Sequence, residues 1–285
     1  MAASWSFSKL SDFEKCKKYF WLKHDQKIPE PERPLPPGKT EHANDRGTRI
    51  HESCENYING SSDELCLEAE KHFGPEIDLL RTMHKDGIVS LEGEWGHNRD
   101  WAPWAWGGEW LEVQEPDELG MPIQKVKALP ERGLADVIYQ KGKQSFVWEP
   151  AWLRLKLDAL VLHDEHTATV IDFKTGRKFG NEVKHGEQLQ LYQLSTFLRY
   201  PQLQTVYAEL WYLDQDEITS QKFSRTMGLR YRDKFGKRGE ALTSCTDFPA
   251  SANIYACRYC QYGSWAGGQC AEGVRTPSKP GKRGA

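Results

Sequence analysis

Residues 169–178 read TVIDFKTGRK and place Asp172 and Lys174 two positions apart at the end of an apolar run. Side chains alternate between the two faces of a strand, so these two charged groups share one face. The simplest interpretation is an ion pair on a half-exposed strand, because such pairs are common on protein surfaces. The apolar Val170, Ile171 and Phe173 around the pair favour a chemical role instead.

A second carboxylate is predicted to lie beside Asp172. The segments 152–162 and 167–174 both have the pattern of strands, and the polar HDEH between them suits a hairpin. A turn centred near Glu165 would place Asp158 opposite Asp172, and opposed side chains in an antiparallel pair lie about 5 Å apart. Two carboxylates at this separation repel each other, and a divalent cation between them converts that repulsion into binding.

Paired carboxylates beside a lysine are the residue types that metal-assisted hydrolysis requires. Oxygen ligands that leave coordination positions open suit Mg²⁺ or Mn²⁺. A lysine next to a metal-bound carboxylate can orient an attacking water or stabilise negative charge on a phosphate. Asp158, Asp172 and Lys174 therefore predict metal-dependent hydrolysis of a phosphodiester bond.

Four sequence elements together resemble the nuclease core of the PD-(D/E)XK superfamily, and specifically its RecB-like branch. LRLKLDAL and TVIDFKTG correspond to the two strands that carry the acidic residues and the lysine. GTRIH supplies the G-x-x-x-H motif of the family as Gly47 and His51, and QLQLY supplies its Q-x-x-x-Y motif as Gln188 and Tyr192. The resemblance implies an α/β fold, with an α+β restriction-endonuclease-like core in which helices flank a central mixed β-sheet.

The resemblance also implies roles for individual residues. His51, Asp158 and Asp172 would bind Mg²⁺ or Mn²⁺, and Lys174 would activate the water. Gln188 and Tyr192, which share a helix face, would contact the DNA backbone or position the lysine. The acidic residue expected before the first of these strands is Glu92, which its spacing to an aromatic residue favours over Glu94. Glu92 could also be structural.

Residues around the predicted metal site suggest nucleic acid as the substrate. Arg177 and Lys178, together with Lys174 and Lys184, form a local basic patch that could follow a phosphate backbone. Tryptophans at 95, 101, 104, 106 and 110 belong to the core or stack on unpaired bases. We expect an exonuclease that acts on single-stranded DNA or duplex ends. The alternatives are a non-catalytic nucleic-acid-binding module with the same fold and a hydrolase of small phosphoesters.

Cysteine spacing predicts a second metal centre. Of the seven cysteines, Cys257, Cys260 and Cys270 lie close together, and Cys16 falls on the apolar face of a helix predicted over 6–24. The sequence resembles a subgroup of RecB-like nucleases that carry a 4Fe–4S cluster on one cysteine before the core and three after it. Four thiolates hold either an iron–sulfur cluster or zinc, so zinc stays open as an alternative, and Cys245 could replace Cys270.

Hydrophobic periodicity indicates further helices and strands. We expect helices over 44–59, 62–85 and 184–199, with an interruption at Gly74–Pro75, and strands over 88–96, 133–140 and 205–214. The predicted organisation has four parts, namely an N-terminal helix and linker at 1–43, a nuclease core at 44–215 with an insertion near 97–150, a cysteine segment at 216–274 and a disordered basic tail at 275–285.

Composition limits the classes of protein that fit. A net charge of −3 over 285 residues excludes a globally basic nucleic-acid binder but allows a local basic channel. No run approaches the roughly 20 apolar residues that span a bilayer, and the N-terminus lacks the order of a signal peptide. We expect a cytoplasmic protein without membrane contact (in the host cytoplasm if it comes from a phage). The sequence has no G-x-x-x-x-G-K-[ST] loop, so a helicase or recombination partner protein would supply any unwinding.

Overall fold

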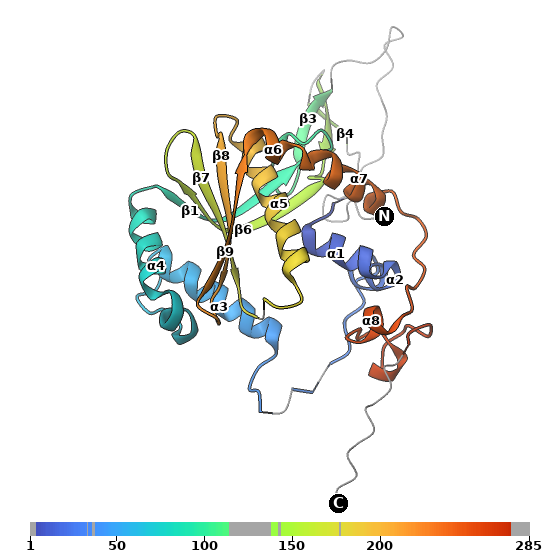
Figure 1. Ribbon diagram of the computed structural model, residues 1–285. Helices are drawn as coiled ribbons and strands as arrows, with labels where there is room; N and C mark the ends of the chain where they lie inside the picture. Colours follow the sequence, from blue (N-terminus) through green and yellow to red (C-terminus); the bar gives the residue numbers. More distant parts are fainter. Residues whose placement is uncertain are drawn as a thin grey trace, which may run out of the picture. The chain divides into compact units, whose positions relative to one another are not determined.

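The computed structural model describes residues 4–32, 34–35, 38–113, 138–141, 144–176 and 178–274. The chain divides into two compact units (Figure 1), one formed by 35–237 and one by 1–34 with 238–285. Arg177 and the predicted basic tail at 275–285 lie outside the described residues. None of the helices in the described ranges combines the length and the apolar character that a bilayer span requires.

A six-stranded mixed sheet forms the centre of the larger unit, in the order β2-β1-β6-β7-β8-β9. Only the central pair β7–β8 is parallel, and the other neighbours are antiparallel. This arrangement confirms the predicted fold class. The strands are β1 (Val89–His97), β2 (Pro103–Trp104), β6 (Leu153–Leu162), β7 (Thr167–Lys174), β8 (Thr205–Tyr212) and β9 (Glu217–Ser224).

Helices cover both faces of this sheet. The apolar faces of α3 (Ala43–Ile58) and α4 (Leu67–Lys85) form one core with Ile171 and Phe173 of β7. On the opposite face lies α5 (Glu182–Arg199), because Tyr192 of that helix contacts Asp172, the residue between those two. Strand alternation on β7 therefore separates an apolar face from a face that carries charge.

The hairpin between β6 and β7 has the register that the sequence predicts. The ladder pairs Leu162 with Ala168 and continues to Ala159 with Ile171. The same antiparallel alignment, extended one step, would pair Asp158 with Asp172. The ladder ends before that step, so the two strands diverge where the predicted carboxylates begin.

The segment near 97–150 holds more regular structure than its polar sequence suggests. A three-stranded sheet in the order β3-β5-β4 joins β3 (Glu109–Val113), β4 (Ile138–Lys141) and β5 (Gln144–Glu149). Strand β4 corresponds to the end of the strand expected at 133–140, whereas β5 was not expected. Trp95 and Trp101 are buried, so these two tryptophans belong to the core and do not offer a surface to bases.

The smaller unit contains the N-terminal helices and the C-terminal segment. The helix expected over 6–24 consists of α1 (Phe7–Lys15), α2 (Lys17–Phe20) and a π-helical turn, η1 (Trp21–Asp25). Cys16 is extended (φ −163°, ψ 114°) between α1 and α2. The prediction that Cys16 lies on a helix face was therefore wrong, because the helix breaks at that residue.

The remaining helices lie towards the C-terminus and were not predicted. They are α6 (Arg225–Leu229), α7 (Tyr231–Thr243), α8 (Ile254–Cys257) and the short 3₁₀ turn η3 (Ser264–Ala266). Arg225 at the start of α6 donates hydrogen bonds to the carbonyls of Phe197 at 2.9 Å and Leu203 at 3.4 Å. A positive side chain at the end of α5 satisfies unpaired carbonyls and complements the helix dipole.

We predict that Arg225→Met lowers the free energy of unfolding by about 1.5–3 kcal/mol, the range for hydrogen bonds that involve a charged group. Urea denaturation measures this change. The exposed Arg230 at the end of α6 provides the matched control, and Arg230→Met should stay within about 0.5 kcal/mol of the wild type. Equal stabilities of the two variants would show that Arg225 does not anchor the end of α5.

Candidate functional site

The Asp158 carboxylate lies between β6 and β7 at the point where the two strands diverge. Its Oδ2 atom accepts a hydrogen bond of 2.6 Å from the backbone N–H of Phe173. This N–H lies just beyond the last ladder pair, Ala159 with Ile171. The carboxylate thus replaces a backbone carbonyl as the partner of that donor, which fixes Asp158 next to β7 without a backbone pair.

Asp172 lies at the centre of a hydrogen-bonded network. The Tyr192 hydroxyl lies 3.0 Å from Asp172 Oδ1, and the Gln188 amide donates to the same oxygen at 3.3 Å. The Lys174 ammonium group contacts the other oxygen, Oδ2, as an ion pair. Among the described residues, the Lys174 ammonium group is the partner that the structure gives this buried oxygen. One carboxylate therefore organises side chains from β7 and α5.

Gln188 links the lysine to the rest of this network. Lys174 Nζ donates to Gln188 Oε1 at 2.9 Å, and Gln188 Nε2 lies 2.6 Å from the Tyr192 hydroxyl. Gln188 and Tyr192 stand four residues apart on α5, so they lie on one helix face. The structure brings together Asp172, Lys174, Gln188 and Tyr192, as the sequence suggested.

His51 reaches the same region from α3. Its Nδ1 atom lies 3.1 Å from Asp158 Oδ1, the oxygen that Phe173 does not use. Gly47, one turn earlier, approaches the loop after Lys174 so closely that a Cβ atom there would stand 3.0 Å from Thr175 Oγ1. The G-x-x-x-H motif therefore combines a close approach of the helix with a histidine directed at Asp158.

Burial determines the protonation behaviour of these groups. It raises the pKa of Asp172, and the Lys174 ammonium group opposes that shift. Burial also raises the pKa of Tyr192 well above its ordinary value, so the phenol stays a neutral donor. Burial alone lowers the pKa of His51, but the hydrogen bond to Asp158 and the negative charges of Asp158 and Asp172 together outweigh burial, so the pKa is raised.

Of the other predicted site residues, Glu92 and Lys178 belong to the part of the chain that the structure describes, and Arg177 does not. Glu92 lies on β1, where the pairs Leu91–Ala159 and Gly93–Leu157 place its backbone opposite Asp158. The Lys178 ammonium group forms an ion pair with Glu217 of β9. Arg177, as stated above, is outside the described residues, so its predicted DNA contact stays a prediction.

Sequence reasoning missed a histidine next to the lysine. His185 Nδ1 lies 2.7 Å from the hydroxyl of Tyr212, and Tyr212 pairs with Lys174 across β7 and β8. Burial lowers the pKa of His185 to about 4, and the Lys174 and Lys184 charges add to this effect. The signal was present, because His185 precedes Gln188 by three residues and shares its helix face.

The donor set decides which metal could fit here. Within the described residues, no group of three or more His, Cys, Asp or Glu side chains is arranged to hold a metal ion. Asp158 and Asp172 instead supply two carboxylates, and Asp172 Oδ2 has only an ion-pair contact with Lys174. Mg²⁺ commonly uses one or two carboxylates and keeps water in its other positions, so this pair suits Mg²⁺ or Mn²⁺.

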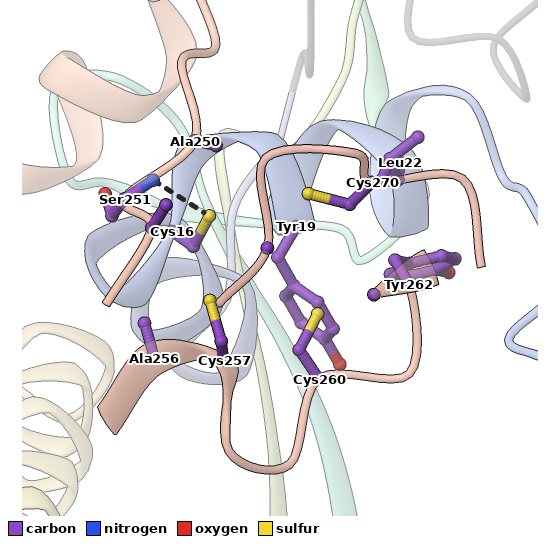
Figure 2. Close-up of a pocket in the computed structure, with 13 residues that line it drawn as sticks. Cys16, Tyr19, Leu22, Ala250, Ser251, Ala256, Cys257, Cys260, Tyr262 and Cys270 are labelled. Carbon is purple, nitrogen blue, oxygen red and sulfur yellow. Dashed lines mark hydrogen bonds between the residues drawn. The ribbon is translucent and has the colours of Figure 1, made fainter. Parts of the chain in front are cut away.

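A pocket in the smaller unit is lined by four cysteines. Figure 2 shows the sulfur atoms of Cys16, Cys257, Cys260 and Cys270 directed into this shared space. The backbone N–H of Ser251 donates to Cys16 Sγ at 3.4 Å. The break between α1 and α2 therefore turns the Cys16 thiol towards the C-terminal segment.

The cysteines near the C-terminus differ in whether they line this pocket. Burial raises the pKa of Cys260, and the neighbouring Cys16 and Cys257 add to the shift. Cys245, the possible substitute for Cys270, does not line this pocket, and its thiol donates to Asp247 O at 3.0 Å. Cys270 does line the pocket, and its N–H donates to Tyr262 O at 2.6 Å.

Comparison with known proteins places this arrangement in a family context. A sequence model described as "PD-(D/E)XK nuclease superfamily" matches residues 4–265. No curated protein gives a significant match. A solved structure titled "Crystal structure of SSO0001" is 12% identical, with a TM-score of 0.37 over 96% of this chain and 89% of that chain. That structural likeness is too distant to add to the family match.

We predict that Asp158→Asn lowers the pKa of His51, because the hydrogen bond and the charge of this carboxylate are the two largest causes that raise it. A raised histidine pKa stabilises the fold below the ordinary value of about 6.5, and this contribution is lost as pH rises through the raised pKa. The stability difference between wild type and variant should therefore shrink as pH rises. NMR titration of the histidine ring in EDTA, with His166 of the hairpin turn as control, measures the shift. An unchanged His51 pKa would contradict the assignment.

Proposed function

Because the chain belongs to the PD-(D/E)XK nuclease superfamily, we propose that it hydrolyses phosphodiester bonds of DNA with Mg²⁺ or Mn²⁺ as cofactor. The network of Asp172, Lys174 and Gln188 is the observation that carries this proposal. It combines a carboxylate that can bind a metal with a lysine held beside it. The four motifs further favour the RecB-like branch of the superfamily.

In this proposal Asp158 and Asp172 hold the metal, and His51 either joins them or orients Asp158 through the Nδ1 contact. When bound, the divalent cation supplies Lewis-acid polarisation of the phosphate and a more acidic water. Phe173 N–H and Tyr192 fix the orientation of the two carboxylates through their hydrogen bonds. A ligand pair that is already oriented loses less entropy when it binds a cation.

Lys174 acts next to these carboxylates. Gln188 accepts a hydrogen bond from its ammonium group, which restrains the flexible lysine side chain. From this position the ammonium group can orient the attacking water or stabilise the developing charge on the phosphate. Of the two roles considered for Gln188 and Tyr192, their contacts support positioning of Lys174 and Asp172.

For the substrate we propose single-stranded DNA or duplex ends, cleaved exonucleolytically. Lys174 at the end of β7 and the lysines at 178 and 184 after it supply positive charge that suits a phosphate backbone, and a phosphate would compete with the carboxylates of Asp172 and Glu217 for Lys174 and Lys178. A helicase or recombination protein would act as partner where unwinding is needed. A non-catalytic DNA-binding module is the alternative, and cleavage assays separate the two.

We further propose that Cys16, Cys257, Cys260 and Cys270 hold a 4Fe–4S cluster, with zinc as the alternative. These four residues line one pocket and direct their sulfur atoms into it. Thiolate ligands from both ends of the chain would cross-link the first helices to the C-terminal segment, so metal binding would contribute to folding. The pocket belongs to the smaller unit, and we assign it no step in hydrolysis.

Labelled single- and double-stranded DNA with Mg²⁺, Mn²⁺ or EDTA tests the proposed activity. We predict that Asp172→Asn abolishes cleavage and leaves DNA binding largely intact, because the amide is a poor ligand for the cation. Asp164→Asn in the hairpin turn is the matched control and should cleave like the wild type. Metal-independent cleavage, or full activity of Asp172→Asn, would refute the proposed site.

A second prediction concerns Lys174. Replacement by alanine should lower turnover more than about 100-fold, as expected for a positioned catalytic group, with little change in metal affinity. Lys222→Ala on β9 removes an exposed lysine of the same unit and should leave the rate unchanged. A near-normal rate of Lys174→Ala, with metal binding intact by calorimetry, would reduce Lys174 to an ion-pair partner.

The cluster is tested by colour and metal content. Anaerobically purified wild-type protein should be brown, with about four irons per chain, and Cys16→Ser should lose iron and thermal stability. Cys245→Ser, outside the pocket, should keep both. Colourless protein with one zinc would replace the cluster by zinc, and protein without either metal would remove this part of the proposal.

A further inference from the structure

A tight turn after β7 holds an aromatic side chain outward. The backbone N–H of Asn181 donates to Lys178 O at 3.1 Å, which closes a β-turn with Phe179 and Gly180 at its corners. Gly180 has φ +86°, a conformation that favours glycine at the third position of such a turn. Phe179 therefore stands at the tip of the turn, and its side chain is 81% exposed.

Contacts on both sides hold this turn in place. Gln215 donates to Gly176 O at 2.6 Å before the turn, and Lys178 is paired with Glu217. After the turn, Gly180 N–H donates to Glu182 Oε2 at 2.8 Å as α5 begins. The outward position of Phe179 is thus set by the backbone and by charged neighbours.

Val183 is a second exposed apolar residue, in the first turn of α5. Its side chain is 82% exposed, so neither Phe179 nor Val183 contributes a buried side chain to the core. Exposed apolar side chains such as these gain free energy when a ligand covers them. We call Phe179 and Val183 the apolar pair.

The apolar pair lies on the same two segments of the chain as Lys174 and Gln188. Val183 precedes Gln188 by five residues on α5, which is about 7.5 Å along the helix axis. Phe179 follows Lys174 by five residues, so the chain between them spans at most about 18 Å. Gln188 accepts the hydrogen bond from Lys174, and both segments belong to the larger unit.

Charged side chains of both signs flank the apolar pair, since Lys178 is paired with Glu217 and Glu182 accepts a hydrogen bond from the Gly180 N–H. Lys178 directly precedes Phe179, and Lys184 directly follows Val183. The N-terminus of α5 lies between the two lysines. Proteins that bind single strands combine positive charge for the phosphates with aromatic side chains on which bases stack. A closed duplex keeps its bases stacked inside the helix, where a turn on the protein surface cannot reach their faces.

We propose that Phe179, supported by Val183, stacks on an unpaired base next to the cleaved phosphate. This contact makes single strands and frayed ends the preferred substrates over closed duplex. The inference rests on the proposed nuclease function and adds the residue that selects the strand. Phe179 is a binding residue in this account, and the reacting groups stay Asp158, Asp172 and Lys174.

Binding of a single-stranded oligonucleotide and of a covalently closed circular duplex tests the proposal, with Asp172→Asn as the common background to prevent cleavage. Phe179→Ala should raise the Kd for the single strand by about 5- to 150-fold, the factor that corresponds to loss of one stacked base. Its Kd for the closed duplex should change less than about twofold. Phe179→Trp should retain single-strand binding, because an aromatic ring is kept.

Leu79→Ala provides the matched control, since Leu79 is an exposed apolar residue (59%) on α4 of the same unit. Its Kd for both DNAs should equal that of the background protein. A 2-aminopurine base next to the cleavage position should be quenched by the background protein and not by Phe179→Ala.

The outcomes separate this inference from the proposed function. If the wild type cleaves DNA but Phe179→Ala binds single strands like Leu79→Ala, the stacking contact is wrong and the nuclease assignment stands. Equal weakening of single strand and closed duplex would also overturn it, since charge or folding would then explain the loss. A wild-type protein that neither binds nor cleaves DNA would overturn both.

Discussion

The buried carboxylate of Asp172 is the constraint on which the rest of the larger unit depends. A charge with so little solvent contact is unfavourable unless it is paired and hydrogen-bonded. Lys174, Gln188 and Tyr192 together meet this need, and they come from β7 and from α5. The position of α5 on the sheet is therefore coupled to the charge of one residue in the middle strand.

The divergence of β6 and β7 supplies the second part of the site. A regular ladder would leave no donor for a carboxylate, but the free Phe173 N–H provides one for Asp158. The opposite oxygen of Asp158 faces His51, so the loss of one backbone pair brings α3 into the site. Because the backbone pair between Asp158 and Asp172 is missing, the strands separate there. The carboxylates of Asp158 and Asp172 can then share one cation without a further protein ligand.

Patterns within short segments of the sequence were enough to predict part of the fold and part of the site. The hairpin register and the pairing of Gln188 with Tyr192 follow from strand alternation and helix periodicity, which are properties of short segments. The end of the ladder at Ala159, the break at Cys16 and the contact of His185 with Tyr212 depend on tertiary contacts. Phe179 shows the same limit, because an aromatic residue in a sequence gives no sign that its side chain is exposed.

The central claim is that the two carboxylates at the divergent strands share a catalytic cation. A crystal of the protein soaked in Mn²⁺, with anomalous diffraction recorded at the manganese edge, tests it most directly. The account predicts one strong peak that lies within about 2.0–2.6 Å of an oxygen from both Asp158 and Asp172. Manganese bound elsewhere, with these carboxylates still held by His51, Phe173, Lys174 and α5, would contradict it.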